Sequence, residues 1–240
     1  MTEFKKSRWA KPEFTEGYRD GADVFIVERN RMLEIVKSFY EHFGGNKPNS
    51  NVLDLGCGDG IVMYQLLKLD NLIEATLIDG SEDMLNKAKE RLKDFGNLHF
   101  IRASFQEIIN ENTALQNYDF IVSSLAIHHL TLEEKIALFR TIYSHLNADG
   151  YFLNIDVILA PSDAIEKWYL LLWEKWIDER KTLLGIEGSH YHDIVKRYKD
   201  NTDNKPDTLA VQLNALQTIG FKDVDCFYKY GIFAMYGGKK

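Results

Sequence analysis

The spacing of apolar residues changes several times along the chain, and each spacing predicts a different element. From Ala22 to Phe43 the apolar residues recur every three or four positions, which is typical of an amphipathic helix. Short continuous apolar runs follow, and such runs are typical of strands buried on both faces of a sheet. The predicted strands cover residues 51–55, 74–79, 98–103, 118–127 and 151–159, and the helices predicted between them cover residues 60–69, 81–95 and 131–146.

Residues that favour helix starts and turns support these boundaries. Ser81 is a predicted helix N-cap with acidic residues after it, and Thr131 begins a capping-box pattern with Glu134. A turn is predicted at residues 147–150, before the fifth strand. Strands that alternate with helices in this way imply right-handed crossovers and a mostly parallel sheet.

The pattern changes after Pro161, where a helical insertion, a further helix at 208–220 and two short strands are predicted. We therefore expect an α/β fold with a Rossmann-like, seven-stranded, mostly parallel sheet, helices on both faces and an antiparallel last strand. Its expected parts are an N-terminal arm and helix (1–49), a core (50–160), a helical cap (161–205) and the last helix with the closing strand pair (206–240).

In the stretch Val52 to Gly60, a glycine-rich loop (Gly56–Gly60) follows the first strand and opens the next helix. Loops in this position bind nucleotides, because glycine lets the backbone approach a ligand and the helix N-terminus offers free N–H groups. Asp79 ends the second strand, where an acidic residue is expected to meet ribose hydroxyls.

The spacing within the loop separates two ligand classes. Gly56, Gly58 and Gly60 do not follow the G-x-G-x-x-G pattern of dinucleotide sites. Asp54 and Asp59 add negative charge beside the loop, which opposes a pyrophosphate and favours a ligand that carries an amino group or a sulfonium.

Five stretches in order resemble the successive motifs of class I S-adenosylmethionine-dependent methyltransferases of the small-molecule type. They are VLDLGCGDG, LIDGSEDML, IRASFQEI, YDFIVSSLAIHHL and LNADGYFLNID, and they cover residues 50–157. The resemblance implies S-adenosylmethionine as cofactor, S-adenosylhomocysteine as product and a small-molecule acceptor.

The resemblance also implies roles for individual residues. Gly56 and Gly58 would lie against the methionine part of the cofactor, Asp54 would face its amino group, and Asp79 would bind both ribose hydroxyls. The adenine and methyl-group contacts would come from Met84, Ser104, Phe105 and the backbone of Leu125. Purely structural roles are alternatives for three of these residues. Asp54 can be a turn residue at the end of the strand, Met84 can belong to the core, and Ser104 can be a turn residue. Many members of the family have aspartate at the position of Ser104.

His128 and His129 follow the fourth strand, at the sheet edge where ligands of such folds bind. Methyl transfer requires positioning and, for a protonated nucleophile, a base, which a histidine supplies near neutral pH. The alternative is that either histidine only caps a helix or bonds to the backbone.

The cap and the arm carry candidates for substrate contacts. Trp168, Trp173 and Trp176 line up on one predicted helix, either as core packing or as the wall of an acceptor pocket. By resemblance the arm would fold over the cofactor as a lid, with Tyr18 and Arg29 as candidates and Arg29 facing the methionine carboxylate. The alternative for each is an ordinary surface residue.

Other activities stay as alternatives. The arm and the cap are also similar to the carboxy-S-adenosylmethionine synthase branch, whose cap arginine holds a second carboxylate, and Arg197 falls near that place. The loop GCGDG does not follow that branch, and Arg197 can equally be a solvated charge. A non-catalytic protein that binds S-adenosylmethionine is a further alternative. The Asn/Asp-Pro-Pro-aromatic motif of amide methylation is absent.

Composition and charge limit the kinds of partner and ligand that the chain is expected to bind. The net charge of −7 disfavours a nucleic-acid-binding surface, which is usually basic. Cys57 and Cys226 lack the spacing of a zinc site or of a disulfide framework. His190 and His192 have no third candidate metal ligand near them in the sequence, so we expect no metal site. We expect no signal peptide, no membrane partner and a cytoplasmic setting; a homodimer is compatible with the sequence.

Overall fold

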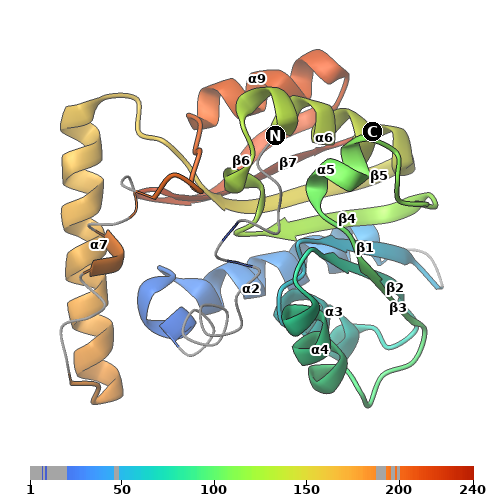
Figure 1. Cartoon of the computed structure of the whole chain (residues 1–240), viewed down its shortest axis with the longest axis horizontal. Coiled ribbons are helices and arrows are strands. Elements are labelled where there is room, and N and C mark those ends of the chain that lie inside the picture. The colour runs from blue at the N-terminus through green and yellow to red at the C-terminus, as the bar shows by residue number, and fades with distance from the viewer. Residues whose placement is uncertain are drawn as a thin grey trace.

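The structure is a computed structural model that describes residues 7, 9, 21–45, 49–187, 193–195, 198 and 201–240. Among these residues seven strands form one sheet in the order β3-β2-β1-β4-β5-β7-β6 (Figure 1). The strands are β1 (Asn51–Leu55), β2 (Glu74–Asp79), β3 (Leu98–Arg102), β4 (Tyr118–Ser124), β5 (Leu146–Val157), β6 (Lys222–Tyr230) and β7 (Phe233–Lys239).

Strand directions confirm the expected fold class. β1 to β5 pair in parallel, while β7 pairs antiparallel with both β5 and β6. The order reverses between β1 and β4, so a crevice opens at the carboxyl ends of these two neighbouring strands.

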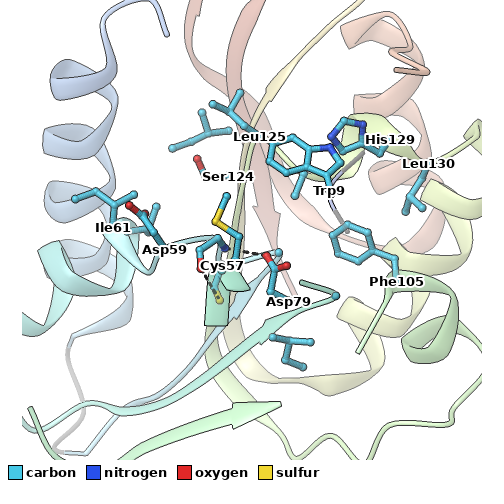
Figure 2. Close-up of a pocket in the computed structure, with 18 of the residues that line it drawn as sticks. Trp9, Cys57, Asp59, Ile61, Asp79, Phe105, Ser124, Leu125, His129 and Leu130 are labelled. Atoms are coloured by element: carbon cyan, nitrogen blue, oxygen red, sulfur yellow. Dashed lines mark hydrogen bonds between the residues drawn. The ribbon is translucent and has the colours of Figure 1, made fainter. Parts of the chain in front are cut away.

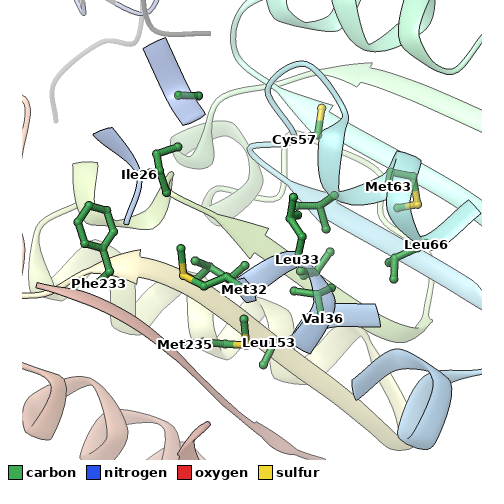
Figure 3. Packing of buried hydrophobic residues seen from close by; sticks show 14 of the residues in the cluster. Ile26, Met32, Leu33, Val36, Cys57, Met63, Leu66, Leu153, Phe233 and Met235 are labelled. Atoms are coloured by element: carbon green, nitrogen blue, oxygen red, sulfur yellow. The ribbon is translucent and has the colours of Figure 1, made fainter. Parts of the chain in front are cut away.

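Helices cover both faces of the sheet (Figure 1). One face carries α2 (Arg29–Phe39), α3 (Ile61–Leu69) and α4 (Glu82–Arg91), and the other carries α5 (Phe105–Ile109), α6 (Leu132–His145) and α9 (Leu209–Ile219). Each face has its own cluster of buried apolar residues. The first cluster joins Met32 and Val36 of α2 to Leu153 of β5 and Met235 of β7 (Figure 3).

Other helical segments of the described chain lie between or beside these elements. A π-helical turn (Tyr40–Gly44) follows α2, a 3-10 turn (Ile127–His129) follows β4, and α7 (Asp163–Leu184) stands beside the layers at the left of Figure 1. Trp173 and Ile177 attach α7 to the first cluster. None of the described helices has the length and apolarity needed to cross a bilayer.

The predicted helix starts are confirmed. The Ser81 side chain accepts the Met84 N–H, and Thr131 forms a capping box with Glu134. A second capping box, formed by Ser104 and Glu107, starts α5. The Ser81 and Ser104 caps fix the points at which the chain leaves the carboxyl ends of β2 and β3.

The single helix predicted from Ala22 to Phe43 is wrong. Residues 21–25 are helical, but the backbone turns left-handed at Glu28, with φ 50°, and α2 starts only at Arg29. In a continuous helix the Phe25 carbonyl would accept the Arg29 N–H. Here it accepts the indole N–H of Trp173 at 2.7 Å instead, so a hydrogen bond from α7 accompanies the break in the helix.

The turn predicted at residues 147–150 lies inside β5, which runs from Leu146 to Val157. Tyr118 pairs with Leu146 and Phe120 pairs with Tyr151, so the four residues between form a bulge rather than a connection. Asp149 takes a positive φ of 65°, which explains the turn-like sequence.

Candidate functional site

The glycine loop is tied to β2 and pressed against the segment after β4. The N–H groups of Gly56 and Cys57 donate to the Ile78 carbonyl at 2.8 and 3.0 Å. Gly56 has φ 66°, and a Cβ added there would lie 2.5 Å from the Ala126 Cβ. Gly58 has φ 54°, but an added Cβ would meet nothing within 4 Å. Gly56 is therefore needed for packing, whereas Gly58 faces open space.

Replacing Gly56 with alanine should lower the free energy of unfolding by about 2 kcal/mol, because left-handed strain adds to a steric collision. Gly58→Ala is the matched control, since it carries the same strain without the collision. Urea unfolding of both variants measures the difference. Equal losses of stability would show that the contact with Ala126 is not tight.

Asp79 is held in one orientation at the end of β2. Its Oδ2 accepts the Gly58 N–H at 2.9 Å (Figure 2), and its Oδ1 accepts the Ser81 N–H at 2.8 Å. Burial raises the pKa of this carboxyl, while the two backbone N–H groups oppose the rise. Each oxygen still has a second lone pair for a ligand hydroxyl on the cavity side.

Asp54 lies beneath the loop and is 1% exposed. Both carboxylate oxygens are buried and make no close hydrogen bond with the described residues. Burial, together with the negative charges of Asp79 and Asp59, raises the pKa of Asp54 to about 8, while the Met63 backbone N–H opposes the rise. Asp59 is ion-paired with Arg91 at 2.5 Å. An uncompensated buried carboxyl in this place favours a cationic ligand.

Cys57 projects from the same loop and is buried. Burial raises the pKa of its thiol, and the carboxylates of Asp79, Asp54 and Asp59 add to the rise. The thiol is therefore protonated at neutral pH.

One cavity at the carboxyl ends of β1, β2 and β4 gathers most of the predicted site residues (Figure 2). Its lining includes Arg29, Gly56, Gly58, Asp79, Met84, Ser104, Phe105, Leu125 and His129. Sequence reasoning missed Trp9, Asp203 and Lys205, which come from distant segments and carry no motif, and Cys57, whose place within the loop was a usable signal.

Two of the lining residues already have polar partners. The Ser104 hydroxyl donates to Glu107 Oε2 at 2.8 Å, within the capping box of α5. Arg29 is ion-paired with Asp23 at 2.6 Å. Contacts of either side chain with a ligand would compete with these bonds.

The two histidines have different surroundings, although their rings lie 4.0 Å apart. His128 is buried, does not line the cavity, and places Nδ1 2.5 Å from a carboxylate oxygen of Asp156. His129 lines the cavity, with the Trp9 ring against it at 5.4 Å and Nδ1 2.9 Å from the Asp203 carbonyl oxygen (Figure 2). A carbonyl only accepts hydrogen bonds, so in this arrangement Nδ1 of His129 carries the proton. Nε2, which is buried, is then the basic nitrogen of the neutral ring.

The three tryptophans of α7 lie outside this cavity. Trp173 is 5% exposed and packs on Tyr198 and Phe233, whereas Trp168 is 57% exposed. Trp176 lies partly buried beside Tyr230. The predicted candidates Tyr18, Arg197, His190 and His192 lie outside the described residues. Among the described residues no group of three or more possible metal ligands occurs.

Comparisons with known proteins agree with this geometry. A family model described as "Methyltransferase domain" matches residues 46–202. Carboxy-S-adenosyl-L-methionine synthase of Nautilia profundicola is 24% identical over 208 residues, which cover 86% of this chain and 82% of that protein.

Solved structures are similar at lower identity. An O-methyltransferase family protein of Burkholderia thailandensis aligns with a TM-score of 0.70 at 12% identity, covering 98% of this chain and 62% of the other. Magnesium protoporphyrin IX methyltransferase of Synechocystis PCC 6803, solved with S-adenosylhomocysteine bound, aligns with a TM-score of 0.65 at 15% identity, covering 97% and 96%. The chain thus spans about three fifths of the first of these structures and nearly all of the second.

Proposed function

Because this chain belongs to the class I S-adenosylmethionine-dependent methyltransferases, we propose that it transfers the methyl group to a small-molecule acceptor whose nucleophile carries a proton. The observation that supports the proposal is the single cavity shared by the glycine loop, Asp79 and His129. The shared cavity supports the proposal, because a base at His129 would lie in the same space as a cofactor bound at Asp79 and the glycine loop.

The residues around the cavity fit the cofactor. Asp79 offers a fixed carboxylate for the ribose hydroxyls, and the space over Gly58 admits a ligand against the backbone. Asp54 does not itself line the cavity, but its buried carboxyl beneath the glycine loop would stabilise a positive charge in the methionine part. Met84 and Phe105 give apolar surface for the adenine ring. The bound cofactor supplies the electrophilic methyl group.

His129 then accepts the proton of the acceptor. Its ring is oriented by the Asp203 carbonyl and flanked by Trp9, and Leu130 and Phe105 add apolar wall on the same side (Figure 2). Apolar wall excludes water, which favours transfer to the acceptor over hydrolysis. Holding acceptor and cofactor in line contributes the rest of the rate.

A second candidate function is carboxy-S-adenosylmethionine synthesis, favoured by the relatives that carry this name. One observation ranks it second: the loop keeps the pattern GCGDG of ordinary methyltransferases.

Titration calorimetry with S-adenosylmethionine and S-adenosylhomocysteine, together with mass spectrometry of co-purified ligands, tests the proposal. We expect micromolar binding of both, followed by methylation of an acceptor in a screen of small, partly apolar molecules. A co-purified cofactor that is heavier by a carboxyl group would put the second candidate first. Failure to bind either ligand would contradict both candidate functions.

Cofactor binding at pH 7 should release close to one proton. The pKa of Asp54 is about 8 in the ligand-free protein, so its carboxyl is mostly protonated at pH 7. A cationic ligand favours the ionised form and lowers this pKa, so affinity rises as the pH increases toward 8. Calorimetry at pH 7 in buffers of different ionisation enthalpy counts the released protons. Asp54→Asn is the control, and equal proton counts for both proteins would contradict the role of Asp54.

A further inference from the structure

Residues 201–207, here called the strap, lie beside both histidines. The Asp203 carbonyl accepts from His129 Nδ1 at 2.9 Å, and the Lys205 N–H donates to the His128 carbonyl at 2.8 Å. Asp203 and Lys205 also line the cavity. The strap is therefore part of the wall at the place where we expect the acceptor.

A buried lysine fixes the strap from the other side. Lys135 of α6 is 0% exposed, and its ammonium donates to the Lys205 carbonyl and to the Asp207 carboxylate, both at 2.5 Å. Fully buried lysines are rare and are almost always paired. The Lys205 residue is thus clamped on both of its peptide groups, one by His128 and one by Lys135.

Attachment of α9 does not require this charge. The Asp207 carbonyl already accepts the Leu159 N–H at 3.0 Å and the Gln212 side-chain amide at 3.1 Å. Replacing a buried ion pair by apolar groups is often neutral for stability, so a pair that is kept can serve to fix one geometry.

We propose that Lys135 is a positioning residue: by fixing the strap it holds the Asp203 carbonyl against Nδ1 of His129, which keeps the Nε2 of that ring basic. The proposal rests on the function proposed for His129. Without the clamp the strap can move, the Nδ1–H loses its acceptor, and the ring populates both tautomers.

Nitrogen NMR of the histidine-labelled protein with S-adenosylhomocysteine bound measures the tautomer directly. The His129 signals are assigned by their loss in His129→Gln. We expect the Nδ1–H tautomer in the unaltered protein and a mixture in the double variant Lys135→Met/Asp207→Asn, which removes both charges and leaves neither unpaired. Asp207→Asn alone keeps the bond from Lys135 to the Lys205 carbonyl and should show a smaller change in the same direction.

Phe139→Leu is the matched control, because Phe139 is buried on the same helix and belongs to the second apolar cluster. It should lower the melting temperature without changing the His129 tautomer. An unchanged tautomer in whichever of the two charge variants folds, or the same change in the control, overturns the proposal. The tautomer is read without turnover, so failure here is distinct from failure of His129 as the base.

Discussion

Replacing Asp79 with alanine should weaken binding of S-adenosylhomocysteine about a hundredfold, or about 2.7 kcal/mol. The variant loses two charge-assisted bonds to ribose hydroxyls. It also frees the Gly58 and Ser81 N–H groups that now fix the loop and the start of α4. Titration calorimetry measures the change.

Glu74→Ala is the control for Asp79, because Glu74 is exposed at the other end of the same strand. Its affinity should equal that of the unaltered protein. A folded Asp79→Ala variant with unchanged affinity would mean that the ribose binds elsewhere.

Replacing His129 with glutamine should lower turnover about a hundredfold, while affinity for S-adenosylhomocysteine stays the same. Glutamine keeps polarity and approximate size but cannot accept the proton. The assay uses the acceptor identified by the screen and follows formation of S-adenosylhomocysteine.

Two comparisons sharpen this result. His145→Gln is the control, because His145 bonds to the Thr141 carbonyl within α6 and lies outside the cavity. Asp156→Asn tests the other histidine, since Asp156 faces His128. A larger loss of turnover for Asp156→Asn than for His129→Gln would indicate that His128, and not His129, accepts the proton of the acceptor.

Local signals predicted the parts of the fold that depend on neighbours in sequence. The strand runs, the Ser81 and Thr131 caps and the loop-to-Asp79 spacing all arise within a few residues or one strand–helix unit. The class of fold, and the gathering of the glycine loop and Asp79 at one cavity, could therefore be predicted.

Contacts between distant segments could not be predicted in this way. The break before α2 coincides with a bond from Trp173 to Phe25, 148 residues away. Periodicity showed that α7 has an apolar face, but not that Trp173 packs in the core rather than in a pocket. The cavity wall that combines Trp9, His129 and the strap comes from distant segments, which no sequence spacing relates.

The position of Cys57 has a consequence for the protein's chemical durability. Electrophiles and peroxides attack the thiolate, and this thiol is kept protonated by burial and by three neighbouring carboxylates. A cysteine in the middle of the glycine loop is therefore a poor target for oxidation. The rate at which a thiol reagent alkylates Cys57 would measure how often this buried thiol becomes exposed.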